Sequence, residues 1–320
     1  METKKVFVVG SNGFLGSNIL RDFLQNGQET YAILRNNSNK WRIEDIIDET
    51  NIILMDAVES SRFRKVLEDM KPDIVVNAMG ADQKAVLHDP SLNWKSNFLT
   101  LVDLANSMRD LKDSILIHAG SSFEYGKVSI IRNPIPEDAK CDPVSEYAVS
   151  KVFATDYLKY FSAYNKVKIF VFRIFNLYGP FESKFRLIPD ISVKAIHGEK
   201  ITLKNPSVSR DFIHVNDVAE AFRIASLTAD ALPNLNILNL GSGVPHTVAE
   251  VASLINEING SSSEIEISLG DQRPENVIPG PIADMKRIKN VLNWRTKYDL
   301  KNGLEDVNQW FRNNLSLYEV

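Results

Sequence analysis

The stretch that decides the fold lies near the N-terminus and reads Val6-Phe-Val-Val-Gly10-Ser-Asn-Gly13-Phe-Leu-Gly16. Its first four residues are β-branched or aromatic and predict a short strand, and the glycines that follow predict a tight turn. Apolar residues then recur at helical spacing up to Asn26, and Gly27 is suited to end that helix. Such a turn presents backbone N–H groups and the positive end of a helix to a phosphate. We therefore predict a phosphate-binding βα unit, although the spacing of the first two glycines differs from the standard dinucleotide pattern.

The first half of the chain repeats this alternation of strand and helix. Short apolar strands are predicted at residues 6–9, 31–34, 52–55, 74–78, 115–119 and 168–174, and helices at 14–26, 60–70, 92–111 and 147–164. Apolar strands separated by helices indicate a parallel sheet that helices cover on both faces. We therefore predict an α/β fold of the Rossmann type, with a doubly wound, mostly parallel sheet of about seven strands.

The second half is less regular. Helices are expected at 188–197, 218–227, 247–259, 285–292 and 300–313, and strands at 210–215, 236–240 and 264–269. We predict that residues 1–175, with about 212–245, form a Rossmann domain that binds NADP, and that about 176–211 and 246–320 form a smaller, mixed α/β substrate domain. With no flexible linker in the sequence, the second domain is expected to pack at the carboxyl ends of the strands, where open α/β folds bind ligands.

Composition is that of an ordinary globular chain, with 320 residues of which 44% are apolar and 24% charged. The 41 acidic and 37 basic residues give a net charge of −4, which argues against nucleic acid as the main partner. A single cysteine, Cys141, excludes an intramolecular disulfide and a zinc site built of thiolates. The five histidines show no ligand spacing, so we predict no metal site.

We expect the protein to be cytoplasmic, with no membrane partner. The first residues run directly into a strand, without the apolar stretch and small-residue cleavage site of a signal peptide. No stretch approaches the roughly 20 apolar residues that a membrane span needs.

The residues after the predicted strands bear on the choice of cofactor. An acid at the end of the second strand would bind the adenosine ribose hydroxyls, but this sequence has Leu34-Arg35. A guanidinium suits a 2′-phosphate, unless Arg35 is a solvated surface residue. Asp56, after the third strand, suits the adenine amino group or is a plain loop residue. We predict NADP(H), with NAD(H) as the alternative, bound by Gly10, Asn12, Gly13, Phe14, Leu15, Gly16, Arg35, Asp56, Ala78, Tyr147 and Lys151.

The segment Tyr147-Ala-Val-Ser-Lys151 is the candidate for catalysis. Residues four apart on a helix lie on one face, and a lysine beside a phenol favours the phenolate, so Tyr147 is suited to exchange a proton. Tyr164 and Lys168 have the same spacing, but they straddle a predicted helix end. Ser121 and Ser122 follow a predicted strand, where a hydroxyl can meet a substrate oxygen, although loop serines are commonly turn formers.

These motifs resemble those of a known family. Gly10/Gly13/Gly16, the loop Ala119-Gly-Ser-Ser-Phe-Glu-Tyr-Gly126 and the pair Tyr147/Lys151 are similar to motifs of the extended short-chain dehydrogenase/reductases. Three later segments resemble the branch of NAD(P)-dependent nucleotide-sugar epimerases, dehydratases and reductases: Arg173-Ile-Phe-Asn-Leu-Tyr-Gly-Pro180, Ser209-Arg-Asp-Phe-Ile-His-Val-Asn-Asp-Val-Ala219, and Arg273-Pro-Glu-Asn-Val277 followed by Ala283-Asp284. The resemblance covers nearly the whole chain.

The resemblance implies a role for individual residues. Ser121 would be the active-site hydroxyl, Tyr147 the acid/base, and Lys151 the residue that holds the nicotinamide ribose. Asn97 fits an asparagine that supports the lysine, or is a buried polar helix residue. The implied binding residues for a nucleotide-diphosphate sugar are Ser121, Ser122, Phe123, Asn176, Arg186, Arg210 and Arg273, although isolated arginines are commonly surface residues. The helices predicted at 92–111 and 147–164 resemble a pair that forms a four-helix interface, so a homodimer is expected.

Departures from the family pattern indicate the reaction. The sugar 4,6-dehydratases carry Asp-Glu directly after the active-site hydroxyl, where this chain has Ser122-Phe123, and Glu124 comes one residue too late. We therefore predict NADPH-dependent reduction of the 4-keto group of a nucleotide-linked 4-keto-6-deoxy or 3,6-dideoxy hexose, in deoxysugar biosynthesis. An NAD-dependent nucleotide-sugar 4-epimerase is the alternative. A redox sensor without catalysis is disfavoured, because both Tyr147 and Lys151 are present.

Overall fold

The computed structural model describes residues 3–55, 60–81, 86, 88–268 and 280–318. Seven strands form the main sheet in the order β10-β6-β5-β4-β1-β2-β3. All neighbouring pairs in it are parallel, which confirms the predicted Rossmann-type sheet. The strands are β1 (Lys5–Val9), β2 (Glu29–Leu34), β3 (Asn51–Leu54), β4 (Ile74–Asn77), β5 (Ile115–Ser121), β6 (Lys168–Ile174) and β10 (Leu235–Leu240).

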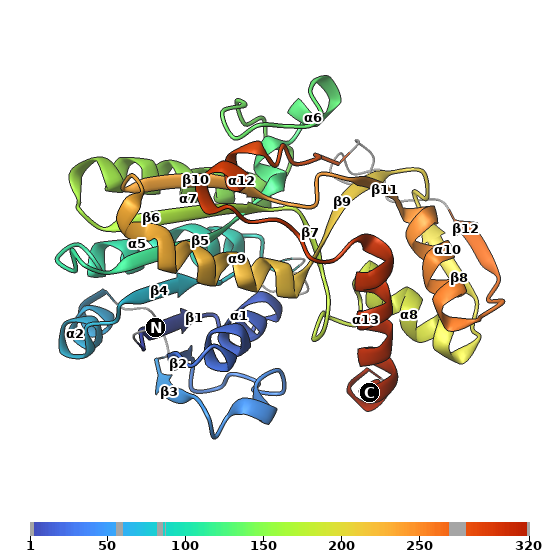
Figure 1. The fold of residues 1–320 in the computed structure, drawn as a ribbon, viewed down its shortest axis with the longest axis horizontal. Coiled ribbons are helices and arrows are strands. Elements are labelled where there is room, and N and C mark those ends of the chain that lie inside the picture. The colour runs from blue at the N-terminus through green and yellow to red at the C-terminus, as the bar shows by residue number, and fades with distance from the viewer. Residues whose placement is uncertain (1–2, 56–59, 82–85, 87, 269–279, 319–320) are drawn as a thin grey trace.

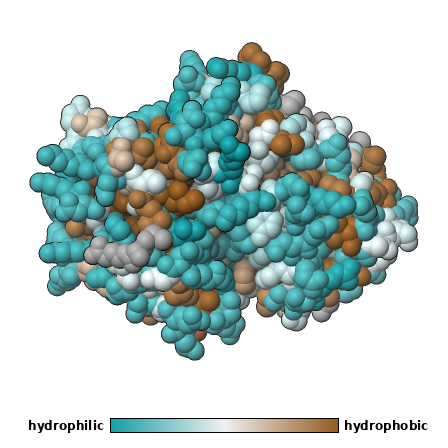
Figure 2. Space-filling view, viewed as in Figure 1, coloured by the Kyte–Doolittle hydropathy of each residue, from teal (hydrophilic) through white to brown (hydrophobic). Residues whose placement is uncertain are grey.

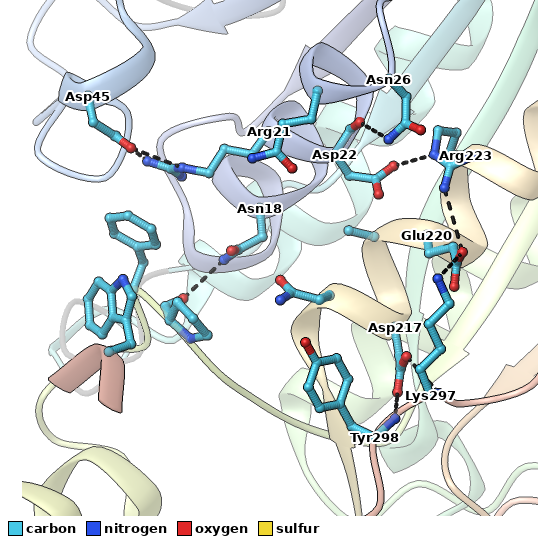
Figure 3. Close-up of a pocket in the computed structure, with 16 residues that line it drawn as sticks. Asn18, Arg21, Asp22, Asn26, Asp45, Asp217, Glu220, Arg223, Lys297 and Tyr298 are labelled. Atoms are coloured by element: carbon cyan, nitrogen blue, oxygen red, sulfur yellow. Dashed lines mark hydrogen bonds and ion pairs between the residues drawn. The ribbon is translucent and has the colours of Figure 1, made fainter. Parts of the chain in front are cut away.

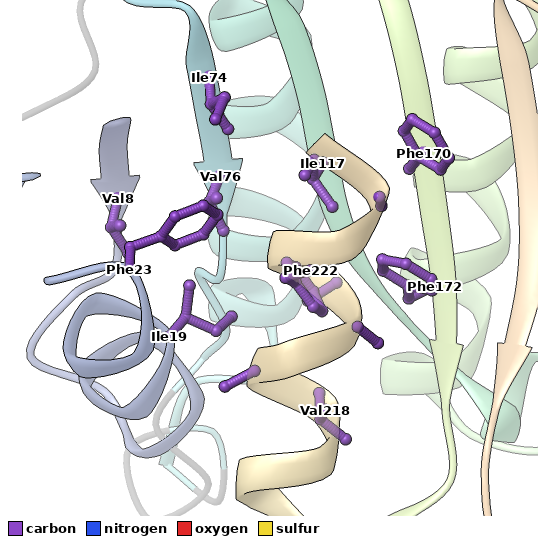
Figure 4. Close-up of a cluster of buried hydrophobic side chains, with 14 of the residues drawn as sticks. Val8, Ile19, Phe23, Ile74, Val76, Ile117, Phe170, Phe172, Val218 and Phe222 are labelled. Atoms are coloured by element: carbon purple, nitrogen blue, oxygen red, sulfur yellow. The ribbon is translucent and has the colours of Figure 1, made fainter. Parts of the chain in front are cut away.

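Helices cover both faces of this sheet because its strands are apolar on both sides. Along β1, Val6 and Val8 belong to one buried core and Phe7 and Val9 to the other. The first core lies under α1 (Phe14–Gln25), α9 (Val215–Thr228) and α12 (Lys286–Leu292), and the second under α2 (Ser60–Met70), α5 (Thr100–Ser107) and α7 (Glu146–Tyr164). Figure 4 shows the first core, where the Phe222 ring of α9 lies 4.9 Å from that of Phe172 on β6.

A smaller lobe, on the right of Figure 1, grows from the carboxyl ends of β6 and β10. It contains a three-stranded sheet of β7 (Asn176–Tyr178), β9 (Ser209–His214) and β11 (Pro245–Thr247), and a two-stranded sheet of β8 (Ile201–Lys204) and β12 (Ile265–Ser268). A separate apolar core joins these strands to α8 (Leu187–His197), α10 (Val248–Asn259) and α13 (Leu300–Asn313). The lobe therefore stands at the edge of the main sheet where its strands end.

The helix predicted at 92–111 is not a regular α-helix. It consists of α4 (Ser91–Asn93), a π-helical turn η2 (Trp94–Leu99) and α5, which ends at Ser107. The predicted end is four residues too late, because the Met108 N–H already shares the Leu104 and Ala105 carbonyls and a turn follows. Helix α9 begins three residues before its predicted start, because His214 Nδ1 accepts from the Asn216 N–H and caps it.

Short elements complete the described chain. They are α6 (Val128–Ile131) and the 3₁₀ turns η1 (Glu44–Ile46), η3 (Ser122–Tyr125), η4 (Ala229–Ala231) and η5 (Leu315–Leu317). Ile130 and Ile131 on α6 are exposed, and the protruding tip over this helix is hydrophobic in Figure 2, on a face that is otherwise mainly hydrophilic. Within the described ranges, no helix has the length and apolar character to cross a bilayer.

Candidate active site

The glycine turn after β1 is closed by backbone contacts that leave no room for side chains. Gly10 has a φ of +84°, and a Cβ there would lie 2.9 Å from the carbonyl carbon of Ala78, which follows β4. A Cβ on Gly16 would lie 2.2 Å from the Gly10 carbonyl oxygen. The Gly13 N–H donates to that same oxygen at 3.0 Å and starts α1, whose N-terminus has no side-chain cap. The free N–H groups of this helix end are therefore available to a phosphate.

The loop after β2 lies beside this turn. Asn12 Nδ2 donates to the Asn39 carbonyl oxygen at 3.1 Å, which ties the glycine turn to the loop. Arg35 is exposed at the start of the loop, where its N–H donates to Ser38 Oγ at 3.0 Å. Phe14 and Leu15, the other residues predicted to bind the cofactor here, are half-buried in the first turn of α1. Asp56 lies outside the described residues.

Ser121, Tyr147 and Lys151 meet at the carboxyl end of β5. Ser121 is the last residue of β5, and α7 carries Tyr147 and Lys151 one turn apart. The Ser121 hydroxyl acts on the pKa of the Tyr147 phenol, and Lys151 Nζ lies 5.9 Å from the centre of the Tyr147 ring. Nζ also donates to the Ala119 carbonyl oxygen at 2.9 Å, which anchors α7 to β5.

Burial shifts the protonation of both α7 residues. It raises the pKa of the Tyr147 phenol, against which the Ser121 hydroxyl and the charge of Arg186 act. It lowers the pKa of Lys151 to about 8, against which the charge of Glu124 acts. Tyr147 is therefore a protonated phenol near neutral pH, with a hydroxyl beside it and a cation behind it. This arrangement can deliver a proton to an oxygen that gains charge.

The π-helical turn brings Asn97 to the start of α7. Asn97 Nδ2 donates to Ser150 Oγ at 3.0 Å, and Ser150 Oγ donates to the Tyr147 carbonyl oxygen at 2.8 Å. Asn97 Oδ1 is buried and accepts no hydrogen bond from the described residues. The asparagine therefore braces the turn that holds Tyr147, through a serine that the sequence did not single out. Single π-turns inside helices commonly mark functional positions.

Three predicted substrate residues lie on the smaller lobe. Asn176 begins β7 and pairs in register with Phe212 of β9, the strand that also carries Arg210. Burial lowers the pKa of Arg210, whose Nη1 donates to the Ser209 carbonyl oxygen at 3.0 Å. Arg186 occupies the N-cap position of α8 without a side-chain capping bond. Its side chain is 57% exposed, and its charge acts to lower the pKa of Tyr147. Arg273 lies outside the described residues.

The loop after Ser121 packs beside the Tyr147 ring. Phe123 is half-buried and its ring meets the Tyr147 ring edge to face, with centroids 6.3 Å apart and an angle of 79°. Ser122 is buried. Glu124 turns away from this ring, and its fully buried carboxylate forms an ion pair with Arg173 of β6 at 2.9 Å. The sequence did not indicate this pair, because it depends on the β5–β6 register, in which Arg173 lies opposite Gly120.

A cavity of about 570 Å³ between α1, α9 and residues 297–298 lies apart from these groups (Figure 3). Its charges are already paired: Arg223 contacts both Asp22 and Glu220, and Glu220 also contacts Lys297. Asp217 accepts from the N–H groups of Lys297 and Tyr298. Among the residues that the structure describes, none of those predicted to bind cofactor or substrate lines the cavity. Its ion pairs join α1, α9 and the chain that leads to α13.

Relatives of this chain include both epimerases and reductases. A putative UDP-glucose 4-epimerase of Methanocaldococcus jannaschii is 24% identical over 97% of this chain and 99% of its own length. The dTDP-4-dehydro-6-deoxy-D-allose reductase of Streptomyces bikiniensis is 25% identical over 97% of each chain. Neither similarity separates the two activities.

Solved structures share the fold over nearly the full length. The UDP-glucose 4-epimerase of Thermotoga maritima, solved with UDP-glucose, superimposes with a TM-score of 0.85 at 22% identity, covering 97% of this chain and 99% of that one. The dTDP-glucose 4,6-dehydratase of Bacillus anthracis, solved with NAD, gives 0.86 at 22% identity and covers 99% of each chain. The model of the NAD dependent epimerase/dehydratase family matches residues 6–241, so the chain belongs to that family, within the extended short-chain dehydrogenase/reductases.

Proposed function

We propose that this protein is an NADPH-dependent reductase of a nucleotide-linked 4-keto-6-deoxy or 3,6-dideoxy hexose. The observation that carries the proposal is the end of β2, where Leu34 is followed by the exposed Arg35 and no acid occurs before Glu44. A carboxylate there would favour the free ribose of NAD, whereas a guanidinium favours a 2′-phosphate. A protein selective for NADPH is better suited to a reduction that consumes the cofactor. An epimerase, in contrast, returns the hydride to the sugar and keeps its cofactor.

The residues present fit a nicotinamide dinucleotide. Gly10 and Gly16 allow the turn to pack closely against the residues after β4 and against its own backbone, and the start of α1, which no side chain of the described residues caps, offers N–H groups to the diphosphate. When bound, this cofactor supplies a hydride. Ser121 and Tyr147 bind the carbonyl oxygen of the sugar, and Tyr147 donates its proton as charge develops there. Lys151 holds the nicotinamide ribose and keeps a positive charge beside the phenol.

The proposed substrate is a nucleotide-diphosphate sugar. Arg210 and Arg273 neutralise its diphosphate, Asn176 donates a hydrogen bond to it, and Arg186 is a further contact. Ser122-Phe123 stands where the dehydratases carry Asp-Glu, which disfavours elimination of water. Two relatives that are 24–25% identical are named as dTDP-4-dehydro-6-deoxy-D-allose reductases, and their substrate belongs to this class.

Stoichiometry tests the proposed reaction. The protein is mixed with NADPH and a panel of nucleotide-linked 4-keto-6-deoxyhexoses, and the loss of NADPH is compared with the product by chromatography. We expect one NADPH to be oxidised for each sugar reduced. The epimerase named for other relatives is the second candidate. Conversion of UDP-glucose to its 4-epimer without net loss of NADPH would establish that activity and refute reduction.

We expect Arg35→Ala to weaken NADPH binding by roughly tenfold or more and to leave NADH binding nearly unchanged. A hydrogen bond to a charged group contributes about 1.5–3 kcal/mol, and only the 2′-phosphate of NADPH makes it. Dissociation constants from the quenching of protein fluorescence measure the effect. Arg132→Ala removes another exposed arginine and is the control. Equal affinity of the wild type for NADPH and NADH would contradict the proposed preference.

The proposed assembly is a homodimer formed through α7 and the helix that contains η2. Phe153, Tyr160 and Tyr164 on α7 are 50%, 62% and 76% exposed, and Leu99 of η2 is 52% exposed. Several large, exposed apolar side chains on neighbouring helices favour a contact with another protein chain. We expect a dimeric mass by light scattering at micromolar concentration, and a monomeric mass for Phe153→Glu. A monomeric wild type would refute the dimer.

A further inference from the structure

Glu124 is a buried carboxylate beside the reacting groups that the proposed reaction does not use. Its side chain is 0% exposed, and that of its partner Arg173 is 3% exposed. Glu124 Oε1 accepts from the Ser121 N–H at 2.9 Å. Glu124 Oε2 accepts from Thr155 Oγ1 and from Arg173 Nε, each at 2.9 Å. Both oxygens of the carboxylate are therefore occupied by groups of this chain.

Stability alone does not account for such a pair. Removing two charges from water costs several kcal/mol for each ion, and a well-packed apolar pair of similar volume is often as stable or more so. Arg173 needs further partners, since its Nη1 donates to the Glu137 carbonyl oxygen at 3.1 Å and its Nη2 lies 3.3 Å from Cys141 Sγ. We therefore interpret the Glu124–Arg173 ion pair as a means of holding Glu124 Oε1 where it accepts from the Ser121 N–H.

The Glu124 carboxylate connects the three elements around Ser121, Tyr147 and Lys151. Ser121 ends β5, Arg173 lies on β6, and Thr155 lies on α7. Thr155 is one turn beyond Lys151 on the same face of the helix, and Tyr147 is one turn before it. The position of Ser121 relative to the helix that carries Tyr147 is therefore fixed through Glu124.

The surrounding backbone is shaped around this contact. A Cβ on Gly120 would lie 2.9 Å from Glu124 Oε1 and 3.0 Å from the Phe172 carbonyl oxygen, so only glycine lets the carboxylate reach the Ser121 N–H. Ser121 Oγ accepts from the Phe123 N–H at 3.2 Å, which occupies a lone pair of the hydroxyl. These two contacts hold the Ser121 backbone and occupy one lone pair of its hydroxyl, which leaves the hydroxyl proton available to a substrate oxygen beside Tyr147.

We propose that Glu124, held by Arg173 and Thr155, is a positioning residue that fixes the Ser121 backbone and aims its hydroxyl at the reacting oxygen beside Tyr147. The inference rests on the proposed function only in that Ser121 and Tyr147 act on a sugar oxygen. It holds equally for ketone reduction and for epimerisation.

Two double variants separate positioning from stability. In Glu124→Gln/Arg173→Met, the amide oxygen still accepts from the Ser121 N–H, and the amide nitrogen donates to Thr155 Oγ1. In Glu124→Met/Arg173→Met, the Ser121 N–H loses its acceptor, while the same arginine contacts are lost in both variants. We expect kcat to fall by about 100-fold in the second variant only, with KM and cofactor affinity within about twofold of the wild type. Thermal unfolding of each variant shows that the assay temperature lies below its Tm.

Crystal structures of both variants with the cofactor decide the inference even if the wild type turns over no sugar tested. A wild type that turns over no sugar would refute the proposed function but not the positioning role of Glu124. We expect Ser121 Oγ to keep its wild-type position relative to the Tyr147 phenol in the glutamine variant and to shift from it in the methionine variant. Equal kcat values, or an unmoved Ser121, would overturn the inference. If the methionine variant does not fold, Thr155→Val removes one partner of Oε2 with little change of shape, and an unchanged kcat there would also overturn it.

Discussion

Replacing Tyr147 by phenylalanine is expected to lower kcat by a factor of about 10²–10⁴ while cofactor binding persists. The substitution removes the hydroxyl that donates the proton, but it keeps the ring that packs against Phe123 with centroids 6.3 Å apart. Lys151 keeps its hydrogen bond to the Ala119 carbonyl oxygen, because that contact does not involve the phenol. The fold and the cofactor site are therefore preserved, and the loss falls on the chemical step.

Steady-state kinetics and fluorescence titration with NADPH measure the two quantities separately. Tyr160→Phe, an exposed tyrosine on the same helix, is the matched control and should leave both unchanged. Lys151→Ala should lower both kcat and cofactor affinity, because the ammonium group holds the ribose and also places a positive charge beside the phenol. Wild-type turnover in Tyr147→Phe would exclude this phenol as the donor. Tyr125 would be a poor substitute, because it is buried and donates to Asn239 Oδ1 at 2.6 Å, and Tyr164 is 76% exposed at the end of α7.

Gly16→Ala is expected to lower cofactor affinity by about 100-fold or more and to destabilise the protein by about 1–3 kcal/mol. The new methyl group would lie 2.2 Å from the carbonyl oxygen of Gly10 and 2.8 Å from its carbonyl carbon. Both are backbone atoms, so the methyl cannot be accommodated by a side-chain rotation. The start of α1 must move away from β1, and its N–H groups then no longer converge on the diphosphate.

Gly27→Ala separates the loss of stability from the loss of binding. Gly27 has a φ of +73° and open space around its Cβ position, so alanine there costs about 1–2 kcal/mol through backbone strain. Because Gly27 lies at the opposite end of α1, cofactor affinity should not change. Denaturant unfolding and fluorescence titration measure both variants. A Gly16→Ala protein that binds NADPH as tightly as the wild type would show that the turn does not hold the cofactor.

The main sheet was predictable because its strands are short apolar runs between clear helical patterns. The parts that the sequence did not give depend on contacts distant along the chain. β7 has three residues, too few for a pattern, and both β7 and the four-residue β8 pair only with strands that are distant along the chain, β9 and β12. The π-helical turn within the predicted helix 92–111 leaves the apolar spacing nearly helical, so periodicity does not reveal it.

The candidate site also combines features that local sequence predicts with others that depend on contacts distant along the chain. Helical spacing predicts that Tyr147 and Lys151 lie on one face, and the family resemblance gives the pair its proposed role. The link from Asn97 through Ser150 to the Tyr147 carbonyl joins two helices whose packing no local pattern specifies. Glu124 stands one residue too late for the elimination pair, so the sequence assigns it no role. Its bond to the Ser121 N–H within one turn, and its pairing with Arg173 across two strands, become visible only in three dimensions.

The strand order has a consequence for biosynthesis. β6 receives its outer neighbour only when β10 has been synthesised, and the intervening chain builds much of the smaller lobe. Until then, β6 presents an open strand edge, and its phenylalanines stay uncovered until α9, which precedes β10 in the chain, has been synthesised. The same face is completed by Ile288 and Leu292 of α12, close to the end of the chain. Unpaired edges beside bare apolar surface invite association between nascent chains. Folding of this sheet therefore ends late, and chaperones that shield hydrophobic strands have the longest time to act on β6.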